Sequence, residues 1–436
     1  MRGKRILQSI ILLIACPIVG TLLLFLVHLL PTGVMKEHLY YSQDIITKEN
    51  LDEVQLPGYP ASFTGNFTDC LMLEHAIYRN SQHSAFSQAM HMYRLESHYD
   101  ENDPSGWSPG VSLIDYINGN PQAREVEYAR YWHGYLLVLK PLLLVTSLGS
   151  IRILNASLSL ILLGITGILL YKRSDELLSA GFVCTMPFFY YFGMYASLSQ
   201  SICFYLMLIS LCILLLLKKE SLEKFGVINY FLLVGTSTAY FDFLTYPLVT
   251  LAFPLVVYGY LYWSEIKPAL IDLIKYPLAW AAGYGFMWAS KWAITDLFYQ
   301  DGIIKNAIST VFSRTSGAGE NRISGWFAVI KDNLAPYLNW GYAFLLGFIL
   351  VAMMLLCVIC KAKLDITKWK TALALLIPAV LPFAWYFICE NHSKEHWMFT
   401  CKILSIVIFA VLAAFAKLFS YSIRNDKINN SNEEKT

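Results

Sequence analysis

The stretch REVEYARYWHGYLLVLKPLLLVTSLGSIR, residues 124–152, decides how the chain is threaded. Acidic, histidine and basic residues precede an apolar segment, residues 135–148, and Arg152 follows it. If this apolar segment crossed a membrane, every later loop would change sides. Its placement therefore fixes the topology of the remaining chain.

The composition is that of a polytopic membrane protein. Of the 436 residues, 56% are hydrophobic and 15% are charged, and several apolar runs approach the roughly 20 residues that cross a bilayer. The net charge of +2 is too small to indicate nucleic-acid binding. Most of the nine cysteines lie inside apolar runs, which favours a role in packing.

Ten apolar runs are predicted to cross the membrane. The first, residues 6–30, follows the basic segment MRGKR and is predicted to be an uncleaved helix with a cytoplasmic N-terminus. The others are residues 153–171, 177–195, 198–217, 227–243, 246–264, 274–293, 338–360, 371–389 and 399–420.

The basic connectors between these runs give the orientation. By the positive-inside rule they belong in the cytoplasm. They are residues 172–176, 218–224, 265–275 and 361–370. All of them fall there only if residues 135–148 do not cross, so this segment is predicted to be a re-entrant or interfacial helix, broken at Pro141, on the outer side.

The predicted fold is an all-α transmembrane helical bundle with about ten crossings and cytoplasmic termini. Residues 1–420 form a single membrane domain, with a long first extracytoplasmic loop at 31–133 and a second outer loop at 294–336. The polar tail 421–436 is cytoplasmic. The cytoplasmic connectors carry no glycine-rich phosphate loop, so an enzyme of this type would draw an activated substrate from the membrane.

The segment GNFTDCLMLEHAI, residues 65–77, contains the leading acidic candidate. Asn66 or Thr68 can cap a helix that begins at Asp69 and lies along the membrane surface. Asp69 would then favour the helix dipole, or act as a general base for an acceptor hydroxyl. Glu37 and Asp44 are competing carboxylates.

Histidines and a second acid mark other outer segments. His133, beside Arg130, can bind sugar or phosphate, or anchor its loop. His392 and His396 share one face if helical and suit sugar or phosphate contact, or a divalent metal together with Glu390.

Asp242 ends a predicted helix. It is either a headgroup-layer residue or a second acid that orients an acceptor or a metal. The segment SRTSGAGENRISG, residues 313–325, includes Arg314, Glu320 and Arg322 and is either a lid over the site or an ordinary loop.

Several segments resemble the GT-C superfamily of integral-membrane glycosyltransferases, which includes protein O-mannosyltransferases and lipid A aminoarabinose transferases. The order FTDCLMLEHA (67–76), WHGYLLVLKPLLL (132–144) and LGSIRILNASLSLILLG (148–164) is similar to the front end of that group. TAYFDFLTYPL (238–248) and NHSKEHWMFTCK (391–402) resemble outer-face motifs of uncharacterised bacterial members.

The sequence departs from the family pattern at two positions. Cys70 stands where the family usually has a second acid, which leaves Glu74 as a substitute or no substitute at all. Lys402 stands where an arginine is expected, so a positive charge remains without the bidentate fork of arginine.

The resemblance implies inverting transfer of a sugar from a polyprenyl-phosphate donor to an extracytoplasmic cell-surface glycan or lipid. Asp69 would be the base and Asp242 a second acid, with no certain cofactor beyond the lipid-linked donor and a divalent metal left open. Residues expected to bind the donor phosphate or sugar are Arg130, His133, Lys140, Arg152, Lys291, Arg322, His392, His396 and Lys402. Lys140 and Lys291 have an alternative role, which is to snorkel to the membrane interface.

Two other classes of function remain open from the sequence. A transporter or flippase for a lipid-linked glycan would distribute charges through the middle of its helices, whereas here the charges gather on one face. A non-catalytic membrane scaffold with the GT-C fold would explain the missing second acid at Cys70. Membrane lipids are expected partners in every case.

Overall fold

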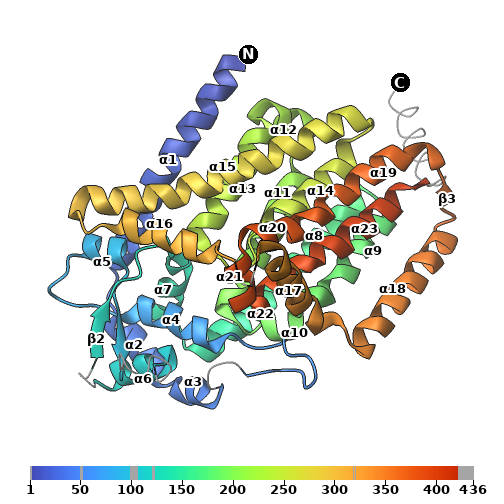
Figure 1. Ribbon diagram of the computed structural model, residues 1–436. Helices are drawn as coiled ribbons and strands as arrows, with labels where there is room; N and C mark the ends of the chain where they lie inside the picture. The colour runs from blue at the N-terminus through green and yellow to red at the C-terminus, as the bar shows by residue number, and fades with distance from the viewer. Residues whose placement is uncertain are drawn as a thin grey trace.

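The computed structural model describes residues 2–49, 53–98, 107–119, 123–317, 319 and 321–420. Glu320 and the predicted tail 421–436 lie outside these residues. Helices hold 78% of the chain, and the strands within the described residues form two short two-stranded sheets (Figure 1). The predicted class, an all-α helical membrane protein, is confirmed.

Within the described residues, six helical segments are long and apolar enough to cross a bilayer. They are α1 (Arg2–His28), α8 (Leu148–Arg173), α11 (Leu198–Leu216), α18 (Trp340–Ile359), the segment Ile366–Ile388 and the segment Trp397–Lys417. The segment Ile366–Ile388 includes α19 (Trp369–Leu376) and α20 (Leu381–Ile388), and Trp397–Lys417 includes α22 (Trp397–Thr400) and α23 (Ser405–Lys417).

The other predicted crossings also fall on helices. These are α9 (Glu176–Thr185) with α10 (Tyr191–Met194), α13 (Val227–Phe241), α14 (Leu248–Tyr262) and α15 (Ile266–Tyr299). Between α11 and α13 lies the short α12 (Lys219–Phe225), and β3 (Lys363–Leu364) pairs with β4 (Phe419–Ser420). The total of about ten crossings stays a prediction.

The first predicted outer loop is an ordered cap of short elements at the lower left of Figure 1. Its helices are α2 (Gly33–Tyr40), α3 (Gln43–Glu49), α4 (Asn66–Ile77), α5 (Ala85–His91) and α6 (Pro109–Asn118). Its strands, β1 (Arg94–Ser97) and β2 (Ala123–Val126), pair antiparallel.

The apolar segment 135–148 contains α7 (Leu136–Val145). At about 1.5 Å per residue, this helix is far too short to span the roughly 30 Å hydrocarbon core by itself. The predicted break at Pro141 is wrong, because the helix continues through that residue. Burial of Leu136, Leu139 and Leu143 on one face holds the helix together despite the lost hydrogen bond.

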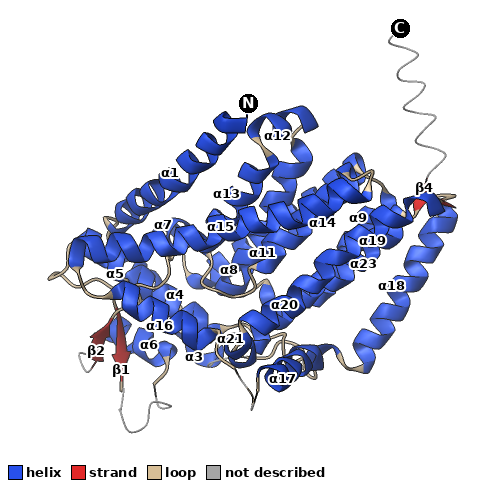
Figure 2. Ribbon diagram, turned by 45° about the horizontal axis from the view of Figure 1, so that its top comes forward, coloured by secondary structure: helices blue, strands red, loops and turns tan. Residues whose placement is uncertain are grey.

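The longest helix, α15, packs closely along α13 (Figure 2). Glycines permit this approach: a methyl group on Gly283 would lie 2.2 Å from the carbonyl oxygen of Leu232, and one on Gly235 would lie 2.1 Å from that of Trp280. Small residues at such contacts let membrane helices approach backbone to backbone. The contact fixes which face of α15 points toward the outer elements.

The predicted outer loop 294–336 is largely helical rather than irregular. After α15 ends at Tyr299, it forms α16 (Ile303–Arg314) and α17 (Arg322–Leu334), and α17 begins with a capping box between Asn321 and Ser324.

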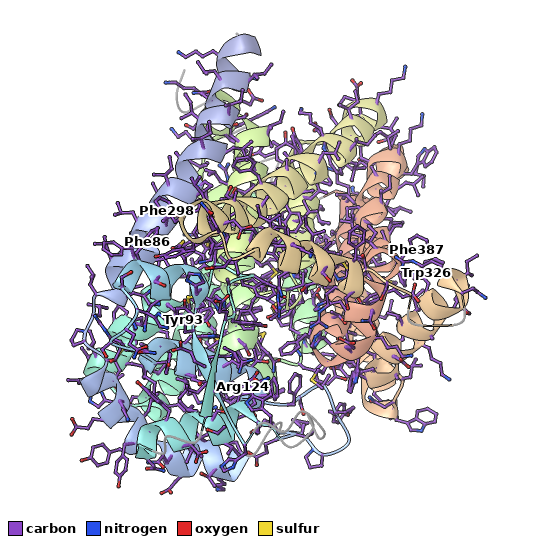
Figure 3. All side chains as sticks on the ribbon, turned by 60° about the vertical axis from the view of Figure 1, so that its left-hand side comes forward. Phe86, Tyr93, Arg124, Phe298, Trp326 and Phe387 are labelled. Atoms are coloured by element: carbon purple, nitrogen blue, oxygen red, sulfur yellow. The ribbon has the colours of Figure 1, made fainter. Side chains whose placement is uncertain are left out.

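Aromatic side chains join this outer segment to the rest of the molecule (Figure 3). The rings of Phe86 and Phe298 lie 5.1 Å apart and connect α5 to the end of α15. Those of Trp326 and Phe387 lie 5.8 Å apart and connect α17 to α20. The outer helices are therefore packed against both the first outer loop and the membrane helices.

Candidate functional site

Helix α4, which carries Asp69, begins differently from the prediction. Its N-cap is Gly65, in a left-handed conformation with φ 69°, and the helix starts at Asn66 rather than at Asp69. Glycine adopts this conformation without steric cost, whereas Asn66 and Thr68 are already inside the helix. Most of α4 is buried, so it lies within the packed outer elements and not along an open membrane surface.

Asp69 is fully buried and caps another helix, α11. Its carboxylate accepts hydrogen bonds from the backbone N–H groups of Leu198 (2.8 Å) and Ser199 (2.9 Å). It also accepts from the hydroxyls of Ser199 (2.7 Å) and Ser197 (3.1 Å). The first N–H groups of a helix have no partner inside the helix, so this carboxylate completes the start of α11.

Arg152 provides the counter-charge. Its guanidinium is paired with Glu49 and lies 4.0 Å from the Asp69 carboxylate. Burial raises the pKa of Asp69, while Arg152 and the hydrogen bonds from Ser199 and Leu198 oppose the rise. Both residues thus take part in one buried network that holds α3, α4, α8 and α11 together.

Glu74, the predicted substitute for the missing second acid, is also buried. One carboxylate oxygen accepts from the Leu95 N–H at 2.6 Å, and the other has no hydrogen-bond partner. Burial raises the pKa of Glu74 to about 8. Cys70 contacts Asn66 through its sulfur at 3.6 Å. Glu74 therefore faces β1 and does not pair with Asp69.

We expect Glu74 to make stability fall as pH rises. Between a pKa near 4.5 in the unfolded chain and about 8 in the fold, the folded state holds a proton that the unfolded state has lost. Melting temperatures of the detergent-solubilised protein should thus decline through this window and level off above it. The isosteric Glu74→Gln variant stays neutral and should show a shallower decline; equal slopes in the two proteins would contradict the assignment.

His133 belongs to a buried ring cluster. Its Nδ1 lies 3.0 Å from the Tyr135 hydroxyl and its Nε2 3.0 Å from the Tyr128 carbonyl oxygen. His75 lies 3.3 Å from the same Tyr135 hydroxyl. Burial lowers the pKa of His133 to about 3. Its backbone φ of 55° is left-handed, an unusual conformation for a residue with a side chain.

The three candidate lysines are fully buried and donate to backbone carbonyl groups. Lys140 bonds the Ala76 oxygen at 2.7 Å, and Lys291 bonds the Ala89 oxygen at 2.7 Å. Lys402 bonds the Met398 oxygen at 2.8 Å. Ala76 and Ala89 lie near the C-termini of α4 and α5, where a cation is favourable. These bonds account for Lys140 and Lys291 without snorkelling.

Arg322 has a comparable structural role. It donates to the carbonyl groups of Phe387 and Ile388 at the end of α20, and its Nε lies 3.2 Å from the buried Glu390 carboxylate. This ion pair holds the start of α17 against α20 and α21 (Glu390–Glu395).

Asp242 and the two late histidines meet at the bend between α13 and α14. The Asp242 carboxylate accepts from the N–H groups of Leu244 (2.9 Å) and Thr245 (3.0 Å). His392 lies 2.9 Å from the Leu244 carbonyl oxygen, and its ring is 4.8 Å from that of His396. Leu244 has a left-handed φ of 73°, so this bend is conformationally strained.

An aromatic cavity of about 250 Å³ lies above this bend. It is partly open and is bounded by the first outer loop, α15, α16 and α20. Its lining residues are Arg130, Tyr131, Leu244, Tyr284, Trp288, Trp292, Ala307, Thr310, Val311, Arg314, Thr315, Trp385 and Cys389. Its aromatic side chains together with Arg130 make the cavity suited to a ligand with both a ring and a negative charge.

The cavity wall contains hydrogen-bond donors without partners. Four buried atoms have none: the Nε of Arg130, the hydroxyl of Tyr284 and the indole nitrogens of Trp288 and Trp385. A buried donor left unpaired costs about 1–3 kcal/mol. These atoms lie beneath an almost wholly apolar cavity surface, so they would meet a hydrogen-bond acceptor only after their side chains rotate.

An apolar groove of about 500 Å³ lies on the membrane side of this region. It is formed by α7, α8, α11 and α13, and its lining includes Tyr135, Val138, Leu142, Leu154, Leu158, Leu198, Ile209 and Phe241. Val138, Leu158 and Ile209 are among the exposed large hydrophobic residues. The groove therefore opens on an apolar surface that lipid would cover.

Phe243 lies between the groove and the aromatic cavity. Its ring centroid is 5.7 Å from that of Tyr135, which lines the groove, and 6.2 Å from that of Tyr131, which lines the cavity. His133 stacks against the same ring at 6.5 Å. Phe243 thus contacts one lining residue of the groove and one of the aromatic cavity.

Of the predicted site residues, the structure brings Arg130 to the cavity and His133, Asp242 and His392 close beside it. Asp69 and the three lysines line neither the cavity nor the groove. The sequence reasoning missed Tyr284, Trp288 and Trp292, although their spacing of four along α15 is visible in the sequence and places them on one helix face.

Comparisons of the chain with models of known protein families, with curated proteins and with solved structures found no match. The GT-C resemblance therefore rests on the quoted motifs alone. Function has to be argued from the cavity and the groove.

Proposed function

We propose that the protein is a membrane glycosyltransferase that moves a sugar from a polyprenyl-phosphate donor to a cell-surface glycan or lipid outside the cytoplasm. The observation that carries the proposal is the close approach of the apolar groove to an aromatic cavity that Arg130 lines, with Phe243 in contact with a lining residue of each. A polyprenyl-phosphate sugar joins a long apolar chain, an anionic phosphate and a polar ring in one molecule.

The two spaces suit the two ends of this donor. The groove between α7, α8, α11 and α13 would take the isoprenoid chain. Arg130 would meet the phosphate and stabilise its charge as it leaves. The indole of Trp288 would pack against the sugar ring, while the unpaired N–H groups of the wall would bind its hydroxyls.

Asp242 is the better supported of the two predicted acids as the general base. Burial is the main cause that raises the pKa of Tyr131, a cavity residue, and the charge of Asp242 adds to the effect, which reflects its proximity. Backbone N–H groups hold both carboxylates, Asp69 at the start of α11 and Asp242 at the bend after α13, but only Asp242 bonds a residue that lines the cavity, Leu244. The acceptor hydroxyl would lose its proton to Asp242, and its oxygen would bond to the anomeric carbon of the sugar as the bond from that carbon to the phosphate oxygen breaks, which releases the polyprenyl phosphate.

The proposal is tested by sugar transfer in proteoliposomes from labelled polyprenyl-phosphate sugars of short and long chain length. Leu158→Trp should fill the groove and reduce transfer from long-chain donors more than from short-chain donors. Leu160→Trp is the matched control, because Leu160 is an exposed apolar residue of the same helix that does not line the groove.

The outcomes separate the proposal from its alternatives. If the parent protein transfers sugar and Leu158→Trp and Leu160→Trp reduce this transfer equally, the groove is not part of the site. Movement of the lipid-linked sugar across the bilayer without transfer would favour a flippase. Neither transfer nor movement with any donor of the panel would favour a non-catalytic scaffold.

A further inference from the structure

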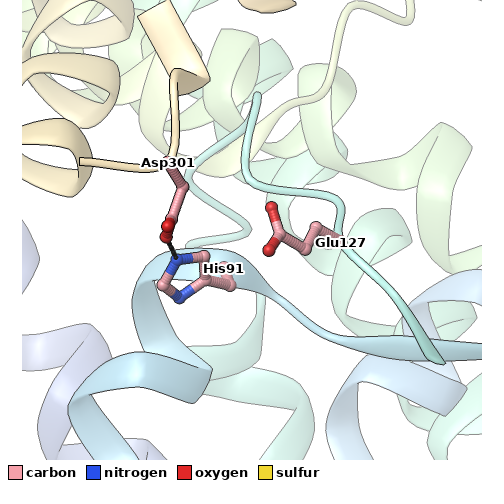
Figure 4. Close-up of side chains that lie close together, drawn as sticks. All are labelled: His91, Glu127 and Asp301. Atoms are coloured by element: carbon pink, nitrogen blue, oxygen red, sulfur yellow. Dashed lines mark hydrogen bonds and ion pairs between the residues drawn. The ribbon is translucent and has the colours of Figure 1, made fainter. Parts of the chain in front are cut away.

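We propose that His91, Glu127 and Asp301 form a binding site for a divalent transition-metal ion such as Zn²⁺ or Mn²⁺. His91 ends α5, Glu127 follows β2, and Asp301 lies between α15 and α16. One nitrogen or oxygen from each side chain lies within 4.8 Å of the other two. Figure 4 shows the hydrogen bond between the Asp301 carboxylate and the His91 ring, with the Glu127 carboxylate close by.

The hydrogen bonds of His91 direct its second nitrogen toward the two acids. Its Nδ1 lies 3.0 Å from the Ser87 carbonyl oxygen, which can only accept, and 3.2 Å from the Ser87 hydroxyl, so the carbonyl favours the tautomer with the proton on Nδ1. Its Nε2 lies 2.8 Å from the Asp301 carboxylate. At this distance a proton on Nε2 makes the contact a hydrogen bond, and a metal ion would replace that proton after the two side chains move slightly apart. Metal-binding histidines commonly donate their other N–H to a backbone carbonyl in this way.

Neighbouring rings fix the orientation of this histidine. His91 stacks on Tyr93 with ring centroids 5.0 Å apart and meets the edge of Tyr299 at 4.5 Å. The His91 side chain is 1% exposed, whereas that of Asp301 is 43% exposed. One ligand is therefore held rigidly, and the two carboxylates are open to water, which gives an ion a route of entry.

The charges also favour a cation at this position. The carboxylates of Glu127 and Asp301 each bring an oxygen within 4.8 Å of the other and of the His91 nitrogen. Two neighbouring carboxylates repel each other, and a divalent ion would relieve this repulsion. One imidazole and two carboxylates form a donor set that suits Zn²⁺ or Mn²⁺, with water completing the coordination.

A metal ion here would connect two segments that line the aromatic cavity, the first outer loop and α16. Glu127 leads into Arg130 of the first outer loop, and Asp301 leads into α16, which supplies Ala307, Thr310 and Arg314 to the cavity. The same two segments meet through Arg130, whose Nη1 lies 3.4 Å from the Asn306 side-chain oxygen. The ion would thus hold α16 against the first outer loop whatever ligand the cavity takes.

The test uses the purified full-length protein in nanodiscs, stripped with a chelator and titrated with Zn²⁺ or Mn²⁺ alone. We expect binding of about one ion per chain, detected by calorimetry and metal content, and a rise in melting temperature that chelator reverses. Asp301→Asn and Glu127→Gln should each weaken affinity at least about tenfold. Both positions are exposed, so the variants should fold.

Asp115→Asn is the matched control, because Asp115 forms an outer-loop pair with His98 at 3.2 Å outside any such three-ligand group of the described residues. It should bind metal as the parent does. The site would be overturned if the parent binds no ion, which would leave His91 and Asp301 as a simple ion pair, or if Asp301→Asn and Glu127→Gln bind as tightly as the parent. The readout is metal binding and does not depend on sugar transfer.

Discussion

Replacing Asp69 with alanine should lower the free energy of unfolding by about 3–5 kcal/mol, the usual cost of removing one partner from a buried charged pair. The change would leave the N–H groups of Leu198 and Ser199 without their acceptor and would remove the buried counter-charge near Arg152. Asp69→Asn should also destabilise the protein. In the parent, both carboxylate oxygens accept hydrogen bonds, whereas in the variant one of these oxygens is replaced by an amide nitrogen, which is itself a donor. The measurement is denaturant or thermal unfolding of the detergent-solubilised protein.

The exposed Asp44 provides a control, and Asp44→Asn should leave unfolding unchanged. The comparison distinguishes the two roles of Asp69, as a helix cap and as a general base. If Asp69→Asn abolishes sugar transfer but melts at the same temperature as Asp44→Asn, the carboxylate acts as a base and not as a cap. If both stability and transfer decline together, loss of activity in Asp69→Asn says nothing about catalysis.

The helices could be predicted from the sequence because hydrophobicity and length are local properties. Each predicted apolar run falls on a helix, and residues 135–148 form a helix too short to cross alone. The start of α4 could not be predicted in the same way. Asn66 and Thr68 are favourable caps by type, but the backbone turns at Gly65, and the contact of Asp69 with α11 determines how the helix sits.

The roles of the buried lysines depend on partners that sequence spacing does not reveal. Lys140 and Lys291 bond carbonyl groups of distant segments, at Ala76 and Ala89. A lysine in an apolar segment looks the same in sequence whether it binds phosphate, reaches the interface or ends a neighbouring helix. Only the packing of α7 and α15 against the first outer loop separates these roles.

For the cavity, by contrast, the aromatic residues of α15 are visible in the sequence but have two possible explanations. Aromatic residues near the end of a membrane helix are typical of the interfacial belt, and this explanation fits Trp288 and Trp292 equally well in sequence. In the structure these rings line a cavity with Arg130. The cavity forms because α16 and α20, which are distant from these rings in the chain, pack close to them.

Removing the charge of Arg130 should have the largest effect on donor binding. Arg130→Gln keeps a long polar side chain but loses the cation at the cavity wall, and a charge-assisted hydrogen bond contributes about 1.5–3 kcal/mol. We therefore expect affinity for a polyprenyl-phosphate sugar to fall about tenfold to a hundredfold. The loss should be smaller for an uncharged lipid analogue, because that ligand has no phosphate for the guanidinium to meet. Affinities are measured by competition with a labelled donor in nanodiscs.

Two matched variants test whether the effect belongs to the cavity. Arg124→Gln removes an arginine that pairs with Glu96 in the first outer loop and does not line the cavity, so it should bind donor as the parent does. Trp288→Phe removes an unpaired indole N–H but keeps a ring, and should weaken binding of the sugar-bearing donor relative to the bare lipid phosphate. Equal losses for both ligands would place Trp288 away from the sugar. If Arg130→Gln binds the donor as tightly as the parent does, the cavity is not the phosphate-binding site. Arg314 is already paired with Glu395, so without Arg130 the aromatic wall has no free positive charge for a phosphate.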